Sequence, residues 1–224
     1  MMLWFQYSDP LLAGAWVTLQ LTFYSTVLGA IFAFAFGIGR LSANRLINAV
    51  SVTFIEVFRG TSLLVQLFWL FFALPLLGQW LGIDLRLPPV LAGTLALALN
   101  IGAYGAEVVR GALQAVPPTQ YEAAKALDLS PRHTLWRIAL PQALPEMMPS
   151  FGNLAIQNLK DTALVSLIGL ADMTFRAEQI RNLTQDSTTI YTLLLFMYFG
   201  MALVISALMK LIERYTCRWR TGAQ

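Results

Sequence analysis

The sequence predicts an all-α membrane protein with five transmembrane helices, and three observations lead to this prediction. Hydrophobic residues make up 57% of the 224 residues and charged residues only 12%, whereas a soluble domain carries about 25% charged residues. Five apolar segments reach the roughly 20 residues that a helix needs to cross a hydrocarbon core. The segments lack the alternation of barrel strands, and helices leave no backbone group unpaired in lipid. We expect a single transmembrane domain over residues 1–224.

The five expected spans are distributed over most of the chain. They cover residues 15–38, 52–77, 90–114, 151–170 and 190–212, and the third and fourth contain polar residues. No lysine or arginine precedes the first span. That span is too long for the apolar core of a cleaved signal peptide, so we expect it to remain in the membrane.

The positions of lysine and arginine predict the orientation. Ten of these residues lie in the last turns of the first, third and fifth spans or beyond them: Arg40, Arg45, Arg110, Lys125, Arg132, Arg137, Lys210, Arg214, Arg218 and Arg220. The opposite side has three: Arg86, Arg176 and Arg181. By the positive-inside rule, the N-terminus is expected outside and the C-terminus in the cytoplasm. Aromatic residues near span ends are expected at the membrane interfaces: Trp80, Tyr191, Tyr215 and Trp219.

A charged segment, residues 119–142, interrupts the apolar chain on the expected cytoplasmic side. A pair of prolines before it stops the preceding helix. Thr119 with Glu122 three residues later has the spacing of a capping box. This spacing predicts a short helix over residues 120–127.

A second helix is expected to begin at Ser130 and Pro131, because serine is a common N-cap and proline is favoured at the first helical position. We expect it to run toward Leu140 and to end before Pro141. Two short helices held at an angle outside the bilayer would offer a surface to a partner protein.

This segment resembles the EAA loop of ABC importer permeases. It contains E-A-A at 122–124 and I-A-L-P at 138–141. Three further blocks resemble the polar amino acid branch of that family: F-R-G-T-S-L-L-V-Q at 58–66, L-N-I-G-A-Y-G-A-E-V-V-R-G at 99–111 and L-K-D-T-A-L-V-S-L-I-G at 159–169. Residues 68–78 and 171–181 look most like permeases for ectoine and hydroxyectoine.

The resemblance implies a type I ABC importer (MetI-like) permease fold, N-out and C-in, in which the loop at about 117–142 forms cytoplasmic coupling helices. These helices would dock on an ATPase subunit through Glu122, Ala123, Ala124, Asp128, Arg132, Ile138, Leu140 and Pro141. The family usually has glycine where this chain has Asp128. Glycine suits a left-handed helix end, and aspartate tolerates that conformation at a cost of about 1–2 kcal/mol.

The resemblance also implies partners and a location. The partners would be a second permease copy or paralogue, two ATPase subunits that bind the ATP and Mg, and an extracytoplasmic binding protein. No nucleic acid is expected. The solute would be small and polar or zwitterionic, either an ectoine-type compatible solute or a polar amino acid. The chain would lie in a bacterial cytoplasmic membrane as a multi-pass protein.

Polar residues within the spans are candidates for the translocation path: Lys160, Asp161, Glu56, Arg59, Gln66 and Asn100. An unpaired charge inside the bilayer costs about 2.5–3.5 kcal/mol, so the pair Lys160 and Asp161 needs compensation. Adjacent helical residues point about 100° apart, so each of the two requires a partner elsewhere. A structural ion pair to another helix explains them equally well, and Asn100 could form a packing hydrogen bond.

Two other features of the third span have structural explanations. Glu107 and Arg110 have the i,i+3 spacing of a local ion pair near the headgroups. Gly102 and Gly105 are expected to allow close helix packing.

The sequence argues against an enzyme and against a bound cofactor. It has no G-x-x-x-x-G-K-[ST] phosphate loop, so energy would come from another subunit. One histidine and one cysteine exclude a zinc-type ligand cluster. The alternative is a stand-alone secondary carrier or channel, which would need its own coupling-ion site. Lys160 and Asp161 offer one candidate, with no matching element in the first half of the chain.

Overall fold

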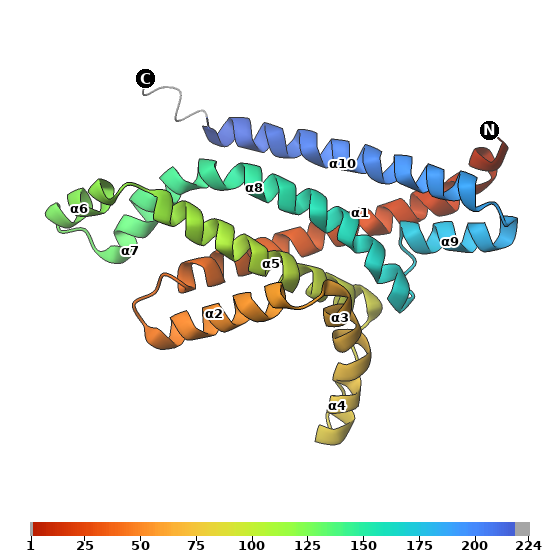
Figure 1. Cartoon of the computed structure of the whole chain (residues 1–224), viewed down its shortest axis with the longest axis horizontal. Coiled ribbons are helices and arrows are strands. Elements are labelled where there is room, and N and C mark those ends of the chain that lie inside the picture. The colour runs from red at the N-terminus through yellow and green to blue at the C-terminus, as the bar shows by residue number, and fades with distance from the viewer. Residues whose placement is uncertain (1, 218–224) are drawn as a thin grey trace.

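A computed structural model describes the backbone of residues 2–217 and the side chains of residues 7–216. All regular structure in that part of the chain is helical. The helices form an elongated bundle (Figure 1). The start of α1 lies near α9 at one end, and α6, α7 and the last turns of α10 lie at the other. Arg218, Trp219 and Arg220 lie outside the described residues.

The α-helices are α1 (Met2–Gly39), α2 (Arg45–Gly60), α3 (Leu63–Phe68), α4 (Leu74–Leu81), α5 (Pro89–Ala115), α6 (Pro118–Ala126), α7 (Pro131–Thr134), α8 (Leu140–Asp161), α9 (Met173–Thr184) and α10 (Ser187–Cys217). Two π-helical segments, η1 (Trp69–Ala73) and η2 (Leu135–Ala139), lie between α-helices without a break. A 3₁₀ segment, η3 (Thr162–Ile168), continues α8.

Four stretches of the described chain are long and apolar enough to cross a membrane: Tyr7–Gly39, Leu63–Leu81, Pro89–Ala115 and Ser187–Thr216. They confirm the first, third and fifth expected spans. The expected second span, 52–77, was wrong in its placement. The chain leaves the helix after Gly60 and starts a new one at Leu63, and extended backbone at Thr61 and Ser62 separates them. The apolar run conceals this break because both flanks are hydrophobic.

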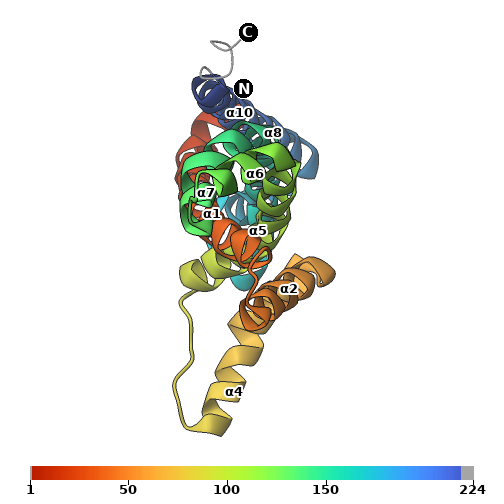
Figure 2. The ribbon, with the colours of Figure 1, turned by 90° about the vertical axis from the view of Figure 1, so that its left-hand side faces the viewer.

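The break gives α2 and α4 different roles. Arg45–Gly60 is an amphipathic helix that packs on α1 and α5, whereas α4 extends away from the bundle (Figure 2). The side chain of Trp80 on α4 is 90% exposed. An apolar helix this exposed in one chain is suited to lipid or to another protein chain.

The expected fourth span, 151–170, is only partly an α-helix. The α-helix begins earlier, at Leu140, runs through Pro145 and Pro149, and ends at Asp161. The chain then tightens into η3 and turns at Gly169, which has φ +79°. The change to a 3₁₀ helix directly follows Asp161, so this carboxylate lies at a junction and not in the middle of a uniform helix.

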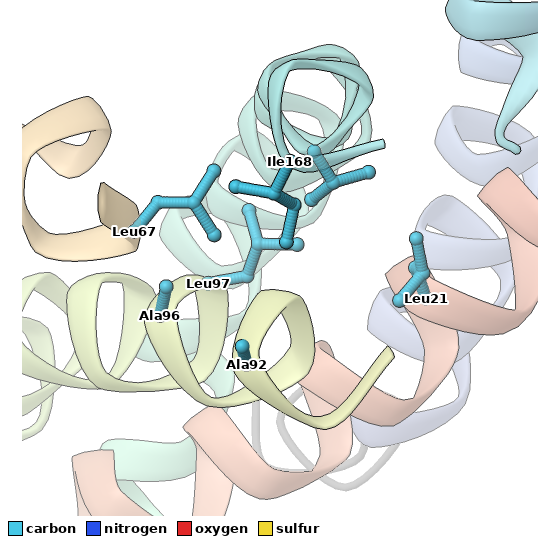
Figure 3. Packing of buried hydrophobic residues seen from close by; sticks show 7 residues of the cluster. Leu21, Leu67, Ala92, Ala96, Leu97 and Ile168 are labelled. Carbon is cyan, nitrogen blue, oxygen red and sulfur yellow. The ribbon is translucent and has the colours of Figure 1, made fainter. Parts of the chain in front are cut away.

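A cluster of apolar side chains holds η3 in place. Leu67, Leu97 and Ile168 point toward one another from α3, α5 and η3 (Figure 3). Ala92 and Ala96 lie beneath them on α5. The cluster fixes the segment that follows Asp161 against two helices, which positions the candidate path described below.

The contact between α1 and α5 is the most extensive in the fold, and small residues make it possible. A Cβ atom at Gly102 would lie 2.7 Å from the Cβ of Phe32 and 3.2 Å from the carbonyl oxygen of Gly29. A Cβ at Gly105 would lie 2.7 Å from the Cβ of Ala33. The predicted role of these glycines in close helix packing is confirmed.

The Gly102→Ala substitution is therefore expected to lower stability by about 1–3 kcal/mol through overpacking. Gly111→Ala on the same helix is the matched control, because a Cβ there meets nothing within 4 Å. The control should keep or slightly raise stability, since alanine favours a helix by up to about 1 kcal/mol over glycine. Thermal unfolding of the two purified variants in detergent measures the difference. Equal unfolding temperatures would contradict the packing argument.

Candidate functional site

The exposed loop at the α6–α7 end begins differently from the sequence prediction. Helix α6 starts at Pro118, and its N-cap is Pro117, with no side-chain capping hydrogen bond. Thr119 lies inside the first turn, so the predicted capping box with Glu122 is wrong. The fixed φ of proline already suits the first helical position, and the helix therefore starts two residues earlier than predicted.

Helix α6 ends in the left-handed backbone conformation that was expected at Asp128, where the family usually has glycine. Asp128 has φ +54°. The N–H of Leu129 donates to the carbonyl of Ala124 (3.0 Å), and the N–H of Asp128 donates to the carbonyl of Lys125 (3.0 Å). These two bonds define a Schellman motif. The prediction of a left-handed residue at 128 is confirmed, and it sets the bend between α6 and α7.

Helix α7 begins as predicted and continues further. The hydroxyl of Ser130 accepts a hydrogen bond from the N–H of His133 (3.3 Å), and Pro131 is the first helical residue. The predicted end before Pro141 is wrong, because the helix passes through η2 directly into α8. The loop is therefore joined to α8 by continuous helix.

The predicted coupling residues divide by exposure. Glu122, Ala123, Asp128, Arg132 and Pro141 are exposed, Ile138 and Leu140 are half-buried, and Ala124 is 2% exposed. The small side chain of Ala124 thus serves the internal packing of the loop. A partner protein would meet Glu122 and Ala123 first.

Specific contacts attach α6 to the membrane helices. The hydroxyl of Tyr121 donates to the carbonyl of Leu113 on α5 (3.0 Å), and Gln142 on α8 donates to Gln120 (3.3 Å). Beneath the loop lies a cluster of buried apolar residues: Ala33, Val109, Leu113, Val116, Ala139, Ala143 and Met147. A displacement of α6 therefore acts on α5 and α8 together.

The candidate path residues Asn100 and Asp161 come together at a narrow cleft between α5 and α8. Tyr104 and Gln157 also line this cleft. The side chain of Gln157 hydrogen-bonds to the half-buried carboxylate of Asp161. Sequence reasoning missed Gln157, although it precedes Asp161 by four residues and so shares its helix face.

Glu56 and Arg59, two of the candidate path residues, form no ion pair with each other in the described part of the chain. The guanidinium of Arg59 lies over the ring of Tyr104, 5.4 Å from its centroid, and the carboxylate of Glu56 lies 4.0 Å from Arg40. Tyr104 offers a cation–π contact, which brings Arg59 next to the cleft. Lys160 is exposed and forms no ion pair within the described part of the chain.

Gln66 has a structural role at the break between α2 and α3. Its Nε2 donates to the carbonyls of Phe58 (2.9 Å) and Thr61 (3.2 Å). Asn100 also donates to the carbonyl of Phe58 (3.2 Å). These bonds satisfy carbonyls that the interrupted helix leaves without N–H partners. Asn100 thus forms the packing hydrogen bond and also lines the cleft.

Asn158 holds α8 to α1, and sequence reasoning missed it. It is almost fully buried, and its Nδ2 donates to Ser25 Oγ (2.7 Å), Thr26 Oγ1 (2.9 Å) and the carbonyl of Thr22 (3.3 Å). Polar groups of this kind associate helices in a membrane. The available signal was its amide side chain in a predicted span, which also contains Asn153.

Glu107 joins two helices near the loop end of the bundle. Its carboxylate accepts hydrogen bonds from Arg110 Nη2 (2.8 Å) and from Arg40, which directly follows the end of α1. The predicted ion pair of Glu107 with Arg110 is confirmed, and Arg40 is an additional partner. The described residues contain no group of three or more histidine, cysteine, aspartate or glutamate side chains able to hold a metal.

Asp172, at the opposite end of the bundle, caps α9. Its carboxylate accepts hydrogen bonds from the N–H groups of Phe175 (2.9 Å) and Thr174 (3.2 Å). The side chain is fully buried. Burial raises the pKa of Asp172 to about 6, although these hydrogen bonds oppose the shift. The folded protein thus favours the protonated form more than the unfolded chain does.

The Asp172→Asn substitution is expected to remove a pH dependence of stability. A carboxyl with a raised folded-state pKa destabilises the fold above that pKa, and this penalty disappears as the pH falls through about 6 toward 4. A shift of about two units corresponds to about 2–3 kcal/mol. The wild type should unfold at a higher temperature at pH 5 than at pH 7.5. The variant should lack this gain because asparagine does not titrate in this pH range. Its fold should remain intact, because asparagine also caps helices.

Asp186→Asn is the control for this prediction. Hydrogen bonds with Thr189 lower the pKa of the exposed Asp186, so any stability it contributes is lost as the pH falls, which is the opposite sign. Identical pH profiles of wild type and Asp172→Asn would contradict the assignment to Asp172.

Comparisons with known proteins now give the family. A family model described as "Binding-protein-dependent transport system inner membrane component" matches residues 10–216. The chain belongs to this family. Its relatives are permease subunits of ABC transporters, which are transport components and not enzymes. The resemblance predicted from the sequence is confirmed at this level.

One relative of the permease is the "Probable amino-acid ABC transporter permease protein y4tF" of Sinorhizobium fredii, which is 66% identical over 97% of this chain and 91% of its own length. A solved structure titled "Crystal structure of an amino acid ABC transporter with histidines" has a TM-score of 0.84 and 34% identity, and covers 96% of this chain and 97% of that one.

A chain of the MetNI methionine ABC transporter has a TM-score of 0.76 at 21% identity over 93% of this chain and 97% of its own. This last likeness concerns the fold alone. Together these findings confirm the predicted MetI-like type I importer permease fold for the permease described here.

Proposed function

We propose that this permease is the membrane-spanning subunit of an ATP-driven importer and that it transmits ATPase closure to its translocation path through α6 and α7. One observation carries the proposal. The bent pair α6–α7 is exposed on its outer side, and hydrogen bonds and a buried cluster attach it to α5 and α8. A surface attached in this way can pass a near-rigid displacement to the helices that border the cleft.

The proposed assembly has two permeases, two ATPase subunits and an extracytoplasmic binding protein in a bacterial cytoplasmic membrane. ATP and Mg would bind to the ATPase subunits. We favour a paralogue as the second permease. Sinorhizobium fredii has, besides the relative that is 66% identical, a second permease named y4tG that is 33% identical to this chain.

The solute that we favour is a polar amino acid. Relatives that are 34% identical are named for L-cystine and glutamine transport. At about 10 Å³ the cleft is too small for a solute in this structure. In a wider state of the path its charges would suit a zwitterion, because the carboxylate of Asp161 lines the cleft and the guanidinium of Arg59 lies over Tyr104, which also lines it. An ectoine-type solute is also zwitterionic and is the second candidate.

Uptake by reconstituted vesicles tests the function. The permease, its ATPase and its binding protein are reconstituted, and uptake of labelled amino acids and of labelled ectoine is measured with and without ATP inside. We expect uptake that requires both ATP and the binding protein, and competition by amino acids. Uptake driven by an ion gradient alone would overturn the proposal in favour of a secondary carrier, and uptake of ectoine alone would overturn the amino acid assignment.

A further inference from the structure

The hydroxyl of Tyr198 on α10 lies where four helical elements of the permease meet. Its oxygen is 2.9 Å from Thr174 Oγ1 on α9. It also hydrogen-bonds to the side chains of Thr18 on α1 and Thr162 at the start of η3. Helix α9 lies toward the end of the bundle opposite α6 and α7 (Figure 1), which is the outer end in the predicted orientation. Tyr198 therefore links segments that are far apart in the sequence.

The hydrogens available in this cluster give the bonds a direction. A tyrosine hydroxyl has one hydrogen to donate, and its oxygen can also accept. The hydroxyl of Thr162 already donates to the carbonyl of Leu159 (2.6 Å), so toward Tyr198 it can only accept. Thr18 and Thr174 are then the donors to the tyrosine oxygen. The single hydroxyl hydrogen of Tyr198 is therefore committed to Thr162.

The first residues of α9 are fixed to the same cluster. The N–H of Met173 donates to Thr18 Oγ1 (3.2 Å), and both residues are fully buried. A Cβ atom at Gly14 on α1 would lie 2.8 Å from the carbonyl oxygen of Asp172, so the backbones of α1 and of the start of α9 are in direct contact. The start of α9 cannot shift against α1 without disturbing the bonds of Thr18.

Thr162 connects this cluster to the candidate path. It is fully buried and directly follows Asp161, whose carboxylate lines the cleft. Asn158, four residues before Thr162 and on the same helix face, is bonded to Ser25 on α1 (2.7 Å). Thr162 is thus a second attachment of the end of α8. Adjacent helical residues point about 100° apart, so the position of Thr162 determines how the Asp161 carboxylate is turned relative to the cleft.

We propose that Tyr198 is a positioning residue of the translocation path: its hydroxyl joins Thr162 to α9 and so ties the orientation of the Asp161 carboxylate to the position of the outer helix. This inference rests on the proposed function, because it assumes that Asp161 meets the solute. Tyr198 acts through Thr162 and needs no contact with the solute. A protein that displaces α9 from outside, such as the proposed binding protein, would alter the solute site without reaching it.

The main test is Tyr198→Phe in vesicles that contain the full transporter. Phenylalanine keeps the ring and removes the hydroxyl, so Thr162 is released while the apolar packing remains. We expect the KM for ATP-dependent uptake to rise about 3- to 10-fold, the range for the loss of one neutral hydrogen bond, while kcat stays within about twofold. In the Asp161→Asn background the same substitution should not raise the KM further, because the residue through which it acts is already changed.

Two substitutions of Thr162 test the same bond from its other side. Thr162→Val removes the acceptor at nearly constant volume and should reproduce the rise in KM. Thr162→Ser keeps the acceptor and should leave the KM within about twofold of the wild type. Tyr191→Phe is the matched control on α10. Tyr191 is 41% exposed, so water can replace the partners of its hydroxyl, and the KM should not change.

Spin labels measure the link without uptake. Cys217, the only cysteine of the sequence, is first replaced by serine. Labels are then placed at two exposed positions, Lys160→Cys on α8 and Asn182→Cys on α9. Tyr198→Phe should broaden the distribution of distances between the labels, because it releases α9 from the α8–η3 junction. Tyr191→Phe should leave the distribution as in the wild type.

Three results would each overturn the inference. They are a wild-type KM in both Tyr198→Phe and Thr162→Val, an equal rise in KM with and without Asp161→Asn, and an unchanged label distribution in Tyr198→Phe. A lower unfolding temperature together with a wild-type KM would assign Tyr198 a purely structural role and so belongs to the first result. The proposed function is tested separately, because it fails only if the wild type shows no ATP-dependent import.

Discussion

Replacing Glu107 with alanine is expected to destabilise the permease by about 3 kcal/mol, because it leaves two guanidinium groups without their shared carboxylate. The side chains of Glu107, Arg40 and Arg110 are only 19%, 24% and 29% exposed, so water replaces the lost interaction poorly. The loss should appear as a lower unfolding temperature in detergent. It should be larger than for any single surface charge of the chain.

Two variants separate charge from size in this prediction. Glu107→Gln keeps the shape and one acceptor oxygen but removes the charge, so we expect about half of the destabilisation. Glu56→Ala is the matched control, since Glu56 is 63% exposed and lies 4.0 Å from the same Arg40. An exposed pair of this kind contributes about 0–1 kcal/mol. Equal effects of Glu56→Ala and Glu107→Ala would refute the proposed network.

The Glu107 network shows which contacts local sequence patterns can predict and which they cannot. The pair with Arg110 could be predicted because both residues lie on one helix face. Arg40 could not, since it lies in the turn after α1 and its contribution depends on how α1 packs against α5. The glycines of α5 predicted that packing only in general terms. Small residues permit a close approach, but they do not specify the partner helix.

Backbone interruptions within apolar runs were the other feature that local sequence patterns could not predict. Hydrophobicity alone placed one span over residues 52–77, whereas extended residues Thr61 and Ser62 divide it. Gln66 and Asn100 stabilise this break by donating to the carbonyl of Phe58. Such a break is maintained by a side chain from a distant helix, so a window of neighbouring residues could not reveal it.

The candidate path was predicted in part. A charge in an apolar run identified Asp161, and the amide in the third span identified Asn100; the structure brings both to one cleft. Lys160 was grouped with them because it is adjacent in sequence. Its exposure separates it, because neighbouring residues of a helix face different directions. Arg59 was also predicted for the path, but its cation–π contact with Tyr104, which brings it beside the cleft, was not indicated by sequence spacing.

The second large effect is expected for Asp161→Asn. Asparagine preserves the size of the side chain and can keep a hydrogen bond with Gln157, so the fold should remain intact. A cationic group of the solute would lose a charged partner, and a hydrogen bond to a charged group is worth about 1.5–3 kcal/mol. We therefore expect the KM for uptake to rise about 10- to 100-fold in vesicles that contain the full transporter.

The neighbouring lysine provides the control for this prediction. Lys160→Gln changes the charge by the same magnitude one residue away, but its side chain lies outside the cleft, so the KM should stay within about twofold of the wild type. Asp161→Glu, which retains the charge, should fall between the two. Because an interaction made only with bound solute alters uptake and not unfolding, all three variants should share the unfolding temperature of the wild type. Normal uptake by Asp161→Asn with normal assembly would exclude this carboxylate from the path and would favour a purely structural role at the α8–η3 junction.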